Sequence, residues 1–314
     1  MHSELLQEAE DYLRVEPAVS FELLHTIEDV DAMPVESQIR WHLINMRAAL
    51  PINNLQQLKT SIEYVFYHYE QTYFKKNVTT ILSALGIWLR KNNYLESARL
   101  SLECAYQNAR NDRQRLTLKN SLALLSRQMN DFDSARKQYK QALPMAKAPQ
   151  RKNIYAMIKM NLGLMALEEH KLIEAEALFR EALDVNQSIN KREGQISSGL
   201  FLLFTFTLQE HVTNYQRLHP RISKLVTDFP NRSRQAMLTW IEAHFDWIRG
   251  RTITDTKRQI LNTEYAFITD NKEKTLIKLF LTKPLQIDIA ETLDLSHKHV
   301  FNRPWFELVK ACEW

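Results

Sequence analysis

Glycine is scarce in this sequence, with only 5 glycines and 9 prolines among 314 residues. A loop that binds phosphate needs several glycines close together, and the sequence contains no glycine-rich nucleotide-binding motif. It also lacks a nucleophile elbow, a zinc-protease helix and paired C-x2-C zinc ligands. These absences predict a protein that is not an enzyme and that binds no cofactor and no metal ion.

Cysteine is equally rare, because Cys104 and Cys312 are the only two. Two cysteines form no disulfide framework, which predicts a reducing compartment. The longest apolar run, 199–208, is far shorter than the ~20 residues that span a membrane, and the first residues lack the apolar core of a signal peptide. With 41 basic and 37 acidic residues, the net charge of +4 does not by itself indicate nucleic-acid binding. We therefore expect a cytoplasmic protein that does not bind a membrane.

What the sequence has instead is a helical repeat, clearest near the middle of the chain. In the first helix of this stretch, Gly163 precedes the small residue Ala166, so another backbone can approach closely. In the second helix, Phe179 lies between Ala175 and Ala182 at helical spacing, which places one aromatic side chain between two small ones on a single face. Such a hairpin cannot bury both of its apolar faces alone, so it needs similar hairpins beside it.

This spacing resembles the tetratricopeptide repeat (TPR), a helix hairpin of about 34 residues with the pattern L-G-x2-small followed by A-x3-F-x2-A. The matching residues within 156–187 are Leu162, Gly163, Ala166, Ala175, Phe179 and Ala182. Two upstream stretches repeat the pattern, at Leu122, Ala123, Ala135, Tyr139 and Ala142, and at Leu85, Gly86, Ala98, Leu102 and Ala105. These intervals exceed the consensus period, so the resemblance is to a divergent, longer-helix form, and Gly199 predicts a fourth, degraded repeat. The resemblance implies an all-α, TPR-like superhelical solenoid of antiparallel helix hairpins with a small helical C-terminal unit.

The pattern divides the chain into four segments. Residues 1–74 are predicted to be degenerate N-terminal repeats or a cap, 75–229 TPR-like repeats, 230–270 a degenerate C-terminal hairpin, and 271–314 helix-turn-helix-like or capping helices. One predicted helix, over residues 55–73, is rich in aromatic side chains. These either pack between repeats or line a ligand site.

The resemblance also implies where a partner binds, because the first helix of each TPR hairpin lines a concave groove. The mapped groove positions include Arg90, Lys91, Asn120, Arg127 and Asn161. An asparagine can bond both the N–H and the C=O of an extended peptide, and the basic residues can pair with an acidic side chain or a C-terminal carboxylate. The same positions can also be solvated polar residues without a partner, and the sequence leaves both interpretations open.

The last part of the chain carries a second pattern, I-A-x2-L-x-L-S-x3-V, which resembles the core of a bacterial helix-turn-helix. The matching residues are Ile289, Ala290, Leu293, Leu295, Ser296 and Val300. Ala290 would be small where two helices cross, and Ser296 would cap a recognition helix. That helix would offer polar side chains to DNA phosphates and base edges, namely His297, Lys298, His299, Asn302 and Arg303.

The same region allows two other interpretations. Ile287, Leu293, Trp305 and Phe306 can cap the apolar end of the solenoid. Residues 301–306 also resemble the entry into a diguanylate cyclase domain, but the Gly-Gly-acidic active site of the cyclase is absent, so no cyclase activity follows.

The leading hypothesis is a bacterial, non-enzymatic adaptor or regulatory protein that holds a protein or peptide partner in the groove of the solenoid. The alternative is a bacterial transcription regulator, in which the solenoid senses a signal and the C-terminal helix-turn-helix binds DNA.

Overall fold

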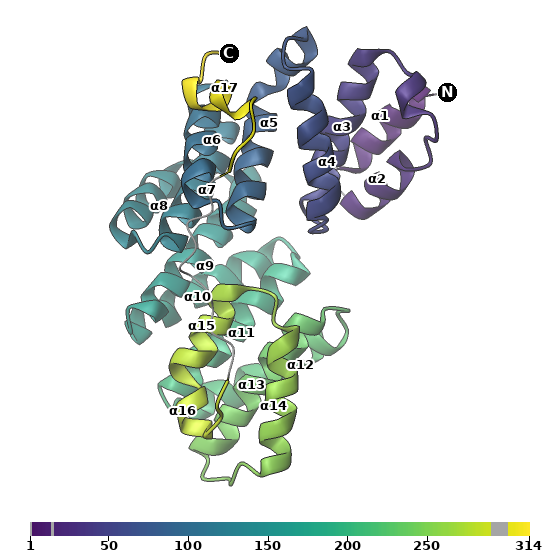
Figure 1. Cartoon of the computed structure of the whole chain (residues 1–314). Helices are drawn as coiled ribbons and strands as arrows, with labels where there is room; N and C mark the ends of the chain where they lie inside the picture. The colour runs from purple at the N-terminus through teal and green to yellow at the C-terminus, as the bar shows by residue number, and fades with distance from the viewer. Residues whose placement is uncertain (1, 14–15, 290–300) are drawn as a thin grey trace. The chain divides into compact units, whose positions relative to one another are not determined.

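The computed structural model describes residues 2–13, 16–289 and 301–314, and every regular element among these residues is a helix (Figure 1). The chain forms two compact units. Unit 1 contains residues 1–138 and 297–314, and unit 2 contains residues 139–296. The all-α prediction is therefore confirmed, and the division between the units falls inside a helix in the middle of the repeats.

Unit 1 is a series of helix hairpins. Its helices are α1 (His2–Tyr12), α2 (Pro17–Leu24), α3 (Val35–Ala49), α4 (Leu55–Tyr67), α5 (Thr72–Lys91), α6 (Leu95–Gln107) and α7 (Asp112–Gln128), with the 3-10 turn η1 (Val30–Ala32). Each helix packs on the next, and the first helices of successive hairpins also contact one another: α1 contacts α3, α3 contacts α5, and α5 contacts α7. We call α1, α3, α5 and α7 the first-helix layer. Unit 1 also holds the short C-terminal helix α17 (Phe306–Ala311).

Unit 2 continues the hairpin pattern. α8 (Phe132–Ala146) passes from unit 1 into unit 2 and is followed by η2 (Pro149–Arg151), α9 (Lys152–Glu168), α10 (Leu172–Ser188), α11 (Arg192–Leu208), α12 (Val212–Thr227), α13 (Arg232–Ile248), α14 (Asp255–Phe267), α15 (Asn271–Phe280) and α16 (Thr282–Leu285). Again the first helices contact one another, since α11 packs on α9 and on α13. Leu285 and Ile287 are buried in the same core as α13 and α14.

The glycines of the repeat let the two helices of a hairpin approach closely. A Cβ added to Gly163 would lie 2.5 Å from Cε1 of Phe179, whose side chain is fully buried. A Cβ added to Gly199 would lie 2.2 Å from Cδ1 of Ile222. Ile222 therefore occupies in the fourth hairpin the place that Phe179 holds in the third, which confirms the degraded fourth repeat.

Gly163→Ala is expected to lower the free energy of unfolding by about 1–2 kcal/mol, because overpacking outweighs the gain in helix propensity. The Phe179 ring also stacks on Phe201, with centroids 5.7 Å apart, and cannot turn aside. Urea unfolding followed by circular dichroism measures the change. Gly199→Ala should also be destabilising, because the added Cβ would lie 2.8 Å from Cγ1 of the buried Ile222 as well as against its terminal methyl group. If Gly163→Ala/Phe179→Leu were no more stable than Gly163→Ala alone, the contact would not be the cause.

The turns between consecutive helices explain how the chain folds with so few glycines. A left-handed residue commonly ends a helix, and asparagine tolerates this conformation better than other residues with a side chain. Positive φ values occur at Asn53, Asn93, Asn130, His170, Asn190 and Glu210. At the end of α5, for example, the N–H of Tyr94 donates to the C=O of Leu89 at 2.9 Å, which closes the helix around Asn93. Asparagine thus replaces glycine at most of these turns.

Two sequence-based expectations for unit 1 are wrong. The aromatic helix predicted over residues 55–73 is two elements, because α4 ends at Tyr67 and α5 begins at Thr72. The two cysteines, predicted to be reduced, form a disulfide bond between Cys104 and Cys312. Cysteine spacing alone could not reveal this pair, because 208 positions separate the two residues.

The predicted helix-turn-helix is not confirmed. Most of its pattern, including His297, Lys298 and His299, lies in residues 290–300, outside the described residues. At either side of that gap, residues 287–289 and 301–303 are not helical. Asn302 and Arg303 therefore do not extend a recognition helix, which corrects their predicted placement.

Candidate functional site

The first-helix layer of unit 1 carries a polar hollow between α1, α3 and α5. Its volume is about 390 Å³, and the lining residues are Glu10, Glu36, Ser37, Arg40 and Tyr73. A smaller hollow beside it shares some of these residues and adds Leu43, Ile44, Arg47, Asn77 and Thr80. Three successive first helices thus contribute polar side chains to one surface, which we call the α1–α5 face.

The charges of the α1–α5 face are centred on one carboxylate. Glu10 accepts a hydrogen bond from Nη2 of Arg40 at 2.8 Å and lies 3.5 Å from Nη1 of Arg47. Arg47 keeps 38% of its side chain exposed, against 22% for Arg40. Glu36 also lines the hollow, so the two arginines and two glutamates of the face balance in charge. The exposed part of the Arg47 side chain is the group that can bond a carboxylate from a ligand.

Two uncharged side chains of α5 complete the face. Burial raises the pKa of Tyr73, and the negative charge of Glu10 raises it further, so its hydroxyl is a neutral hydrogen-bonding group at physiological pH. Asn77 lies one helical turn after Tyr73 and donates from Nδ2 to the Tyr73 carbonyl at 2.9 Å. An amide and a phenol on one helix face can each bond to a peptide backbone.

The predicted basic groove residues of α5 lie at its C-terminal end, where they contact neighbouring elements. Arg90 donates from Nη1 to Oε1 of Gln128 on α7 at 3.0 Å, and Nε2 of Gln128 lies 3.4 Å from the carbonyl of Arg90. Lys91 donates to the side chain of Asn53, in the turn between α3 and α4. Arg90 therefore links two first helices, α5 and α7.

The other predicted groove residues are less accessible. Asn120 and Arg127 lie on α7 of unit 1 with exposed fractions of only 7% and 3%. Asn161 lies on α9 of unit 2 and is half-buried. The five predicted residues thus belong to three first helices and to both units, and none of them lines the hollow between α1 and α5.

Arg40, Arg47 and Asn77 were not predicted from the sequence, whereas Tyr73 belongs to the aromatic stretch expected either to pack between repeats or to line a ligand site. The repeat pattern begins at Leu85, so it does not extend to α3. The helix predicted over residues 55–73 ended at Tyr73, whereas Tyr73 lies in the first turn of α5. The available signal was the spacing of Tyr73, Asn77 and Thr80, which places all three on one face of a helix.

A serine and a histidine lie together between α3 and α4. Nδ1 of His42 lies 3.0 Å from Oγ of Ser61, and Nδ2 of Asn45 donates to the same oxygen at 2.8 Å. Burial, and to a smaller extent the charge of His68, lowers the pKa of His42 to about 4. A nucleophile must reach its substrate, but Ser61 is fully buried, so this pair ties two helices together and offers no hydrolase site.

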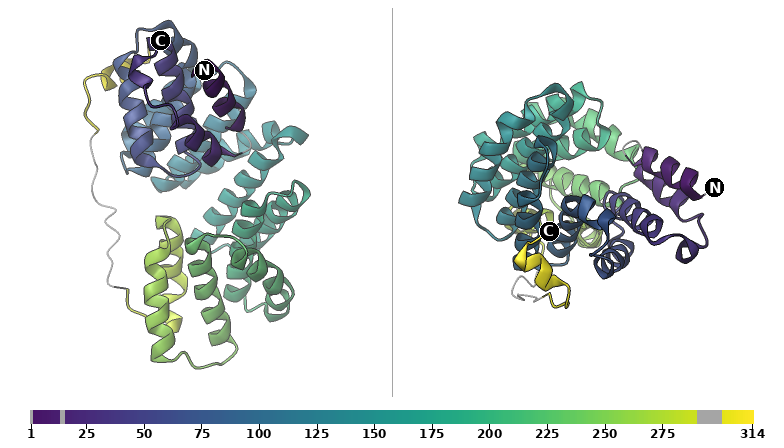
Figure 2. Two further views of the ribbon diagram at one scale, coloured as in Figure 1. Left: turned by 90° about the vertical axis from the view of Figure 1, so that its right-hand side faces the viewer. Right: turned by 90° about the horizontal axis from the view of Figure 1, so that it is seen from above.

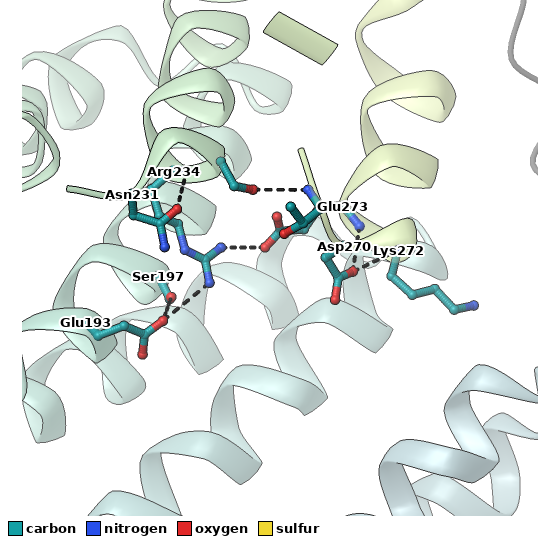
Figure 3. A network of polar contacts seen from close by, with 9 residues as sticks. Glu193, Ser197, Asn231, Arg234, Asp270, Lys272 and Glu273 are labelled. Atoms are coloured by element: carbon teal, nitrogen blue, oxygen red, sulfur yellow. Dashed lines mark hydrogen bonds and ion pairs between the residues drawn. The ribbon is translucent and has the colours of Figure 1, made fainter. Parts of the chain in front are cut away.

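Unit 2 contains a buried ion-pair network where the N-terminal ends of α11, α13 and α15 meet (Figure 3). Arg234 of α13 donates to Glu273 of α15 at 2.5 Å and to Glu193 of α11 at 3.3 Å. Asp270 caps α15 by accepting from the N–H groups of Lys272 and Glu273. Burial raises the pKa of Glu273. Burial alone would lower the pKa of Arg234, but Glu273 and Glu193 raise it overall. The groups of this network satisfy one another, so its role is to hold three helices together.

The described residues hold neither a metal cluster nor a membrane-spanning helix. Within residues 2–13, 16–289 and 301–314, no group of three or more His, Cys, Asp or Glu side chains is placed to hold a metal ion. In the same part of the chain, no helix combines the length and the apolar character needed to cross a membrane.

Comparison with known proteins shows likeness in structure but not in sequence. No protein-family model and no curated protein matches the chain. The structure is similar to BtubC (BKLC) from P. vanneervenii, at 13% identity and a TM-score of 0.50, over 72% of this chain and 91% of that one. It is also similar to the apo form of RapI, at 12% identity and a TM-score of 0.53, over 85% and 86%.

A third similar structure is a Rap protein complexed with Competence and Sporulation Factor, at 12% identity and a TM-score of 0.53. The match covers 91% of this chain and 96% of that one. The fold is a TPR-like helical solenoid. The TPR-like hairpins predicted from the alanine-flanked helices are confirmed, and identities this low extend the likeness to the fold alone.

Proposed function

We propose that this chain is a non-enzymatic adaptor or regulatory protein, and that its TPR-like solenoid binds a segment of a partner protein on the α1–α5 face of unit 1. The observation that carries the proposal is the hollow in which Arg40, Arg47, Tyr73 and Asn77 converge from two first helices. The likeness to a Rap protein whose structure holds a bound factor is consistent with this role.

The chemistry of the face favours an extended, acidic segment. Arg47 is positioned to pair with a carboxylate from the ligand, and Asn77 to bond its backbone. Arg90 and Lys91 would extend the same recognition along α5 within unit 1. The half-buried amide of Asn77 would hold a peptide backbone without selecting a side chain, so the arginines would supply the specificity.

A peptide-display selection against the full chain tests the proposal. We expect acidic sequences to be enriched and to bind the purified protein in fluorescence anisotropy titrations. Arg47→Glu should weaken the selected peptides at least about ten-fold, because a hydrogen bond between charged groups contributes about 1.5–3 kcal/mol. Arg249→Glu, which changes an exposed arginine of unit 2, is the matched control and should leave the affinity unchanged. Equal affinity in both variants would exclude the α1–α5 face.

The alternative of DNA binding has less support. His297, Lys298 and His299 lie outside the described residues, and the guanidinium group of Arg303 pairs with Glu63 of α4 at 2.7 Å. A gel-shift titration of duplex DNA at low salt distinguishes the two proposals, because a DNA-binding regulator shifts the duplex in a salt-dependent way.

A further inference from the structure

The C-terminal residues 301–314, which we call the C-terminal segment, lie on unit 1 although they follow unit 2 in the sequence. Figure 1 shows α17 beside α6, which it contacts, and in Figure 2 the last residues lie on the unit that contains the N-terminus. The surface that receives them is formed by α4, the two ends of α5, and α6. We call it the α4–α6 surface.

Apolar side chains make most of this contact. Phe306 and Val309 are each 1% exposed, and Phe301 is 9% exposed. The ring of Trp305 stacks on Phe66 of α4, with centroids 4.1 Å apart and planes 14° apart. Trp314 lies against Phe74, with ring centroids 5.4 Å apart. Phe66 of α4 and Phe74 of α5 thus pack against the C-terminal segment.

One carboxylate recognises two groups of the segment. Glu63 of α4 accepts from Nε of Arg303 at 2.7 Å through one oxygen, and from Nε1 of Trp305 at 3.0 Å through the other. Bonds to a charged acceptor are stronger than those between neutral groups. They also fix the register of the segment, since both donors must reach the same carboxylate.

The C-terminal segment contacts the α4–α6 surface as a bound peptide would, and not as one hairpin of a solenoid packs on the next. α17 has only 6 residues, too few for a stable isolated helix. All of unit 2 intervenes between α7 and this segment, and on the α4–α6 surface the segment is held by side-chain contacts and by the Cys104–Cys312 bond. An element held in this way can be exchanged between two identical chains, because the same contacts form in either case.

We propose that the α4–α6 surface is a segment-docking site that accepts the C-terminal segment of a second copy of this chain as well as its own. Exchange requires an open disulfide. A thiol reductant opens it by thiol–disulfide exchange: the S–S bond breaks, Cys104 and Cys312 each gain a proton, and two reductant thiols are oxidised to a disulfide. A small-molecule disulfide then reoxidises the two thiols: a new Cys104–Cys312 bond forms within one chain or between two, and the small disulfide is reduced to two thiols.

A pair of complementary variants tests the proposal. The acceptor carries Cys312→Ser and Arg303→Glu, so that its own segment is repelled by Glu63 and cannot form the bond. The donor carries Cys104→Ser and Glu63→Arg, so that its own surface repels Arg303. Only the donor segment on the acceptor surface restores both the native ion pair and the native cysteine pair. We expect mild oxidation of the mixture to give a covalent heterodimer linked through Cys104 and Cys312, identified by peptide mass mapping.

In the control mixture, Arg303 of the donor segment faces a second positive charge at position 63 of the acceptor surface, so the two side chains repel each other. An acceptor with Cys312→Ser and Glu63→Arg, mixed with a donor carrying only Cys104→Ser, should give at least about ten-fold less heterodimer, because a charge-assisted contact is lost. Equal yields in the two mixtures would overturn the proposal. So would a product that contains only Cys104–Cys104 and Cys312–Cys312 dimers.

The unmodified chain gives a second measurement that does not depend on how the variants fold. Labelled (15N) and unlabelled chains are mixed, reduced, and reoxidised at protein concentrations up to about 1 mM, which is comparable to the effective concentration of a tethered segment. We expect disulfide-linked peptides that join a labelled Cys104 peptide to an unlabelled Cys312 peptide. Their absence at every concentration shows that the segment docks only within its own chain and overturns the proposal.

Discussion

Replacing Arg234 with methionine is expected to destabilise unit 2 by about 3–5 kcal/mol, because it leaves Glu273 as a buried charge without its main partner. The side chain of Glu273 is only 9% exposed, and its contact with Arg234 is 2.5 Å long. Hydrogen exchange of peptides from α13 and α15 measures the loss at the site, and urea unfolding measures it for the whole chain.

Three comparisons identify the cause of this loss. Arg251→Met removes an ion pair whose arginine side chain is 71% exposed, and it should cost less than about 1 kcal/mol. Arg234→Met/Glu273→Met should recover most of the stability, because both charges are gone. Without Arg234 the pKa of Glu273 rises further, so lowering the pH protonates it and should reduce the loss. A double variant as unstable as the single one would mean that packing of the Arg234 side chain, and not its charge, stabilises the site.

Acidification is expected to destabilise both units, because each contains a buried neutral histidine. The pKa values of His42 in unit 1 and His244 in unit 2 are lowered to about 4, mainly by burial. The unfolded chain, with a histidine pKa near ~6.5, binds the proton more readily. This stability is therefore fully present above about pH 6.5 and is lost as the pH falls toward 4, by about 2 kcal/mol per histidine at pH 5.

Urea unfolding of the wild type and of His42→Gln at pH 7.5 and pH 5 tests this. Glutamine does not titrate, so the variant should lose less stability than the wild type over this interval, whatever its stability at pH 7.5. His211→Gln changes a histidine whose side chain is 47% exposed and should leave the pH dependence as in the wild type. The same slope in wild type and His42→Gln would mean that His42 is not the group responsible.

The sequence predicts the hairpins well because their packing is local. Ala175, Phe179 and Ala182 place a large side chain between two small ones, and Gly163 leaves the space that Phe179 fills. These requirements act within a hairpin, so a single stretch of sequence reveals them. The break between α4 and α5 was missed because residues 68–71 contain neither glycine nor proline, and the aromatic residues continue across the turn.

The candidate site was harder to predict, because it depends on contacts between hairpins that lack the repeat pattern. Arg40 and Arg47 lie on α3, where no residue spacing indicates a groove position, and their charge is shared with Glu10 of α1. The disulfide and the docking of the C-terminal segment join residues separated by more than half of the chain. Such contacts depend on the whole fold, so periodicity and motif spacing carry no signal for them.

The disulfide also determines how the chain transmits mechanical force. A pull applied between a point before Cys104 and a point after Cys312 passes directly through the covalent bond between these residues. The 105–311 loop, which contains all of unit 2, carries none of that load while the bond is closed. Only after reduction can stretching extend the hairpins of unit 2, so the redox state of a single bond decides which part of the molecule yields to tension.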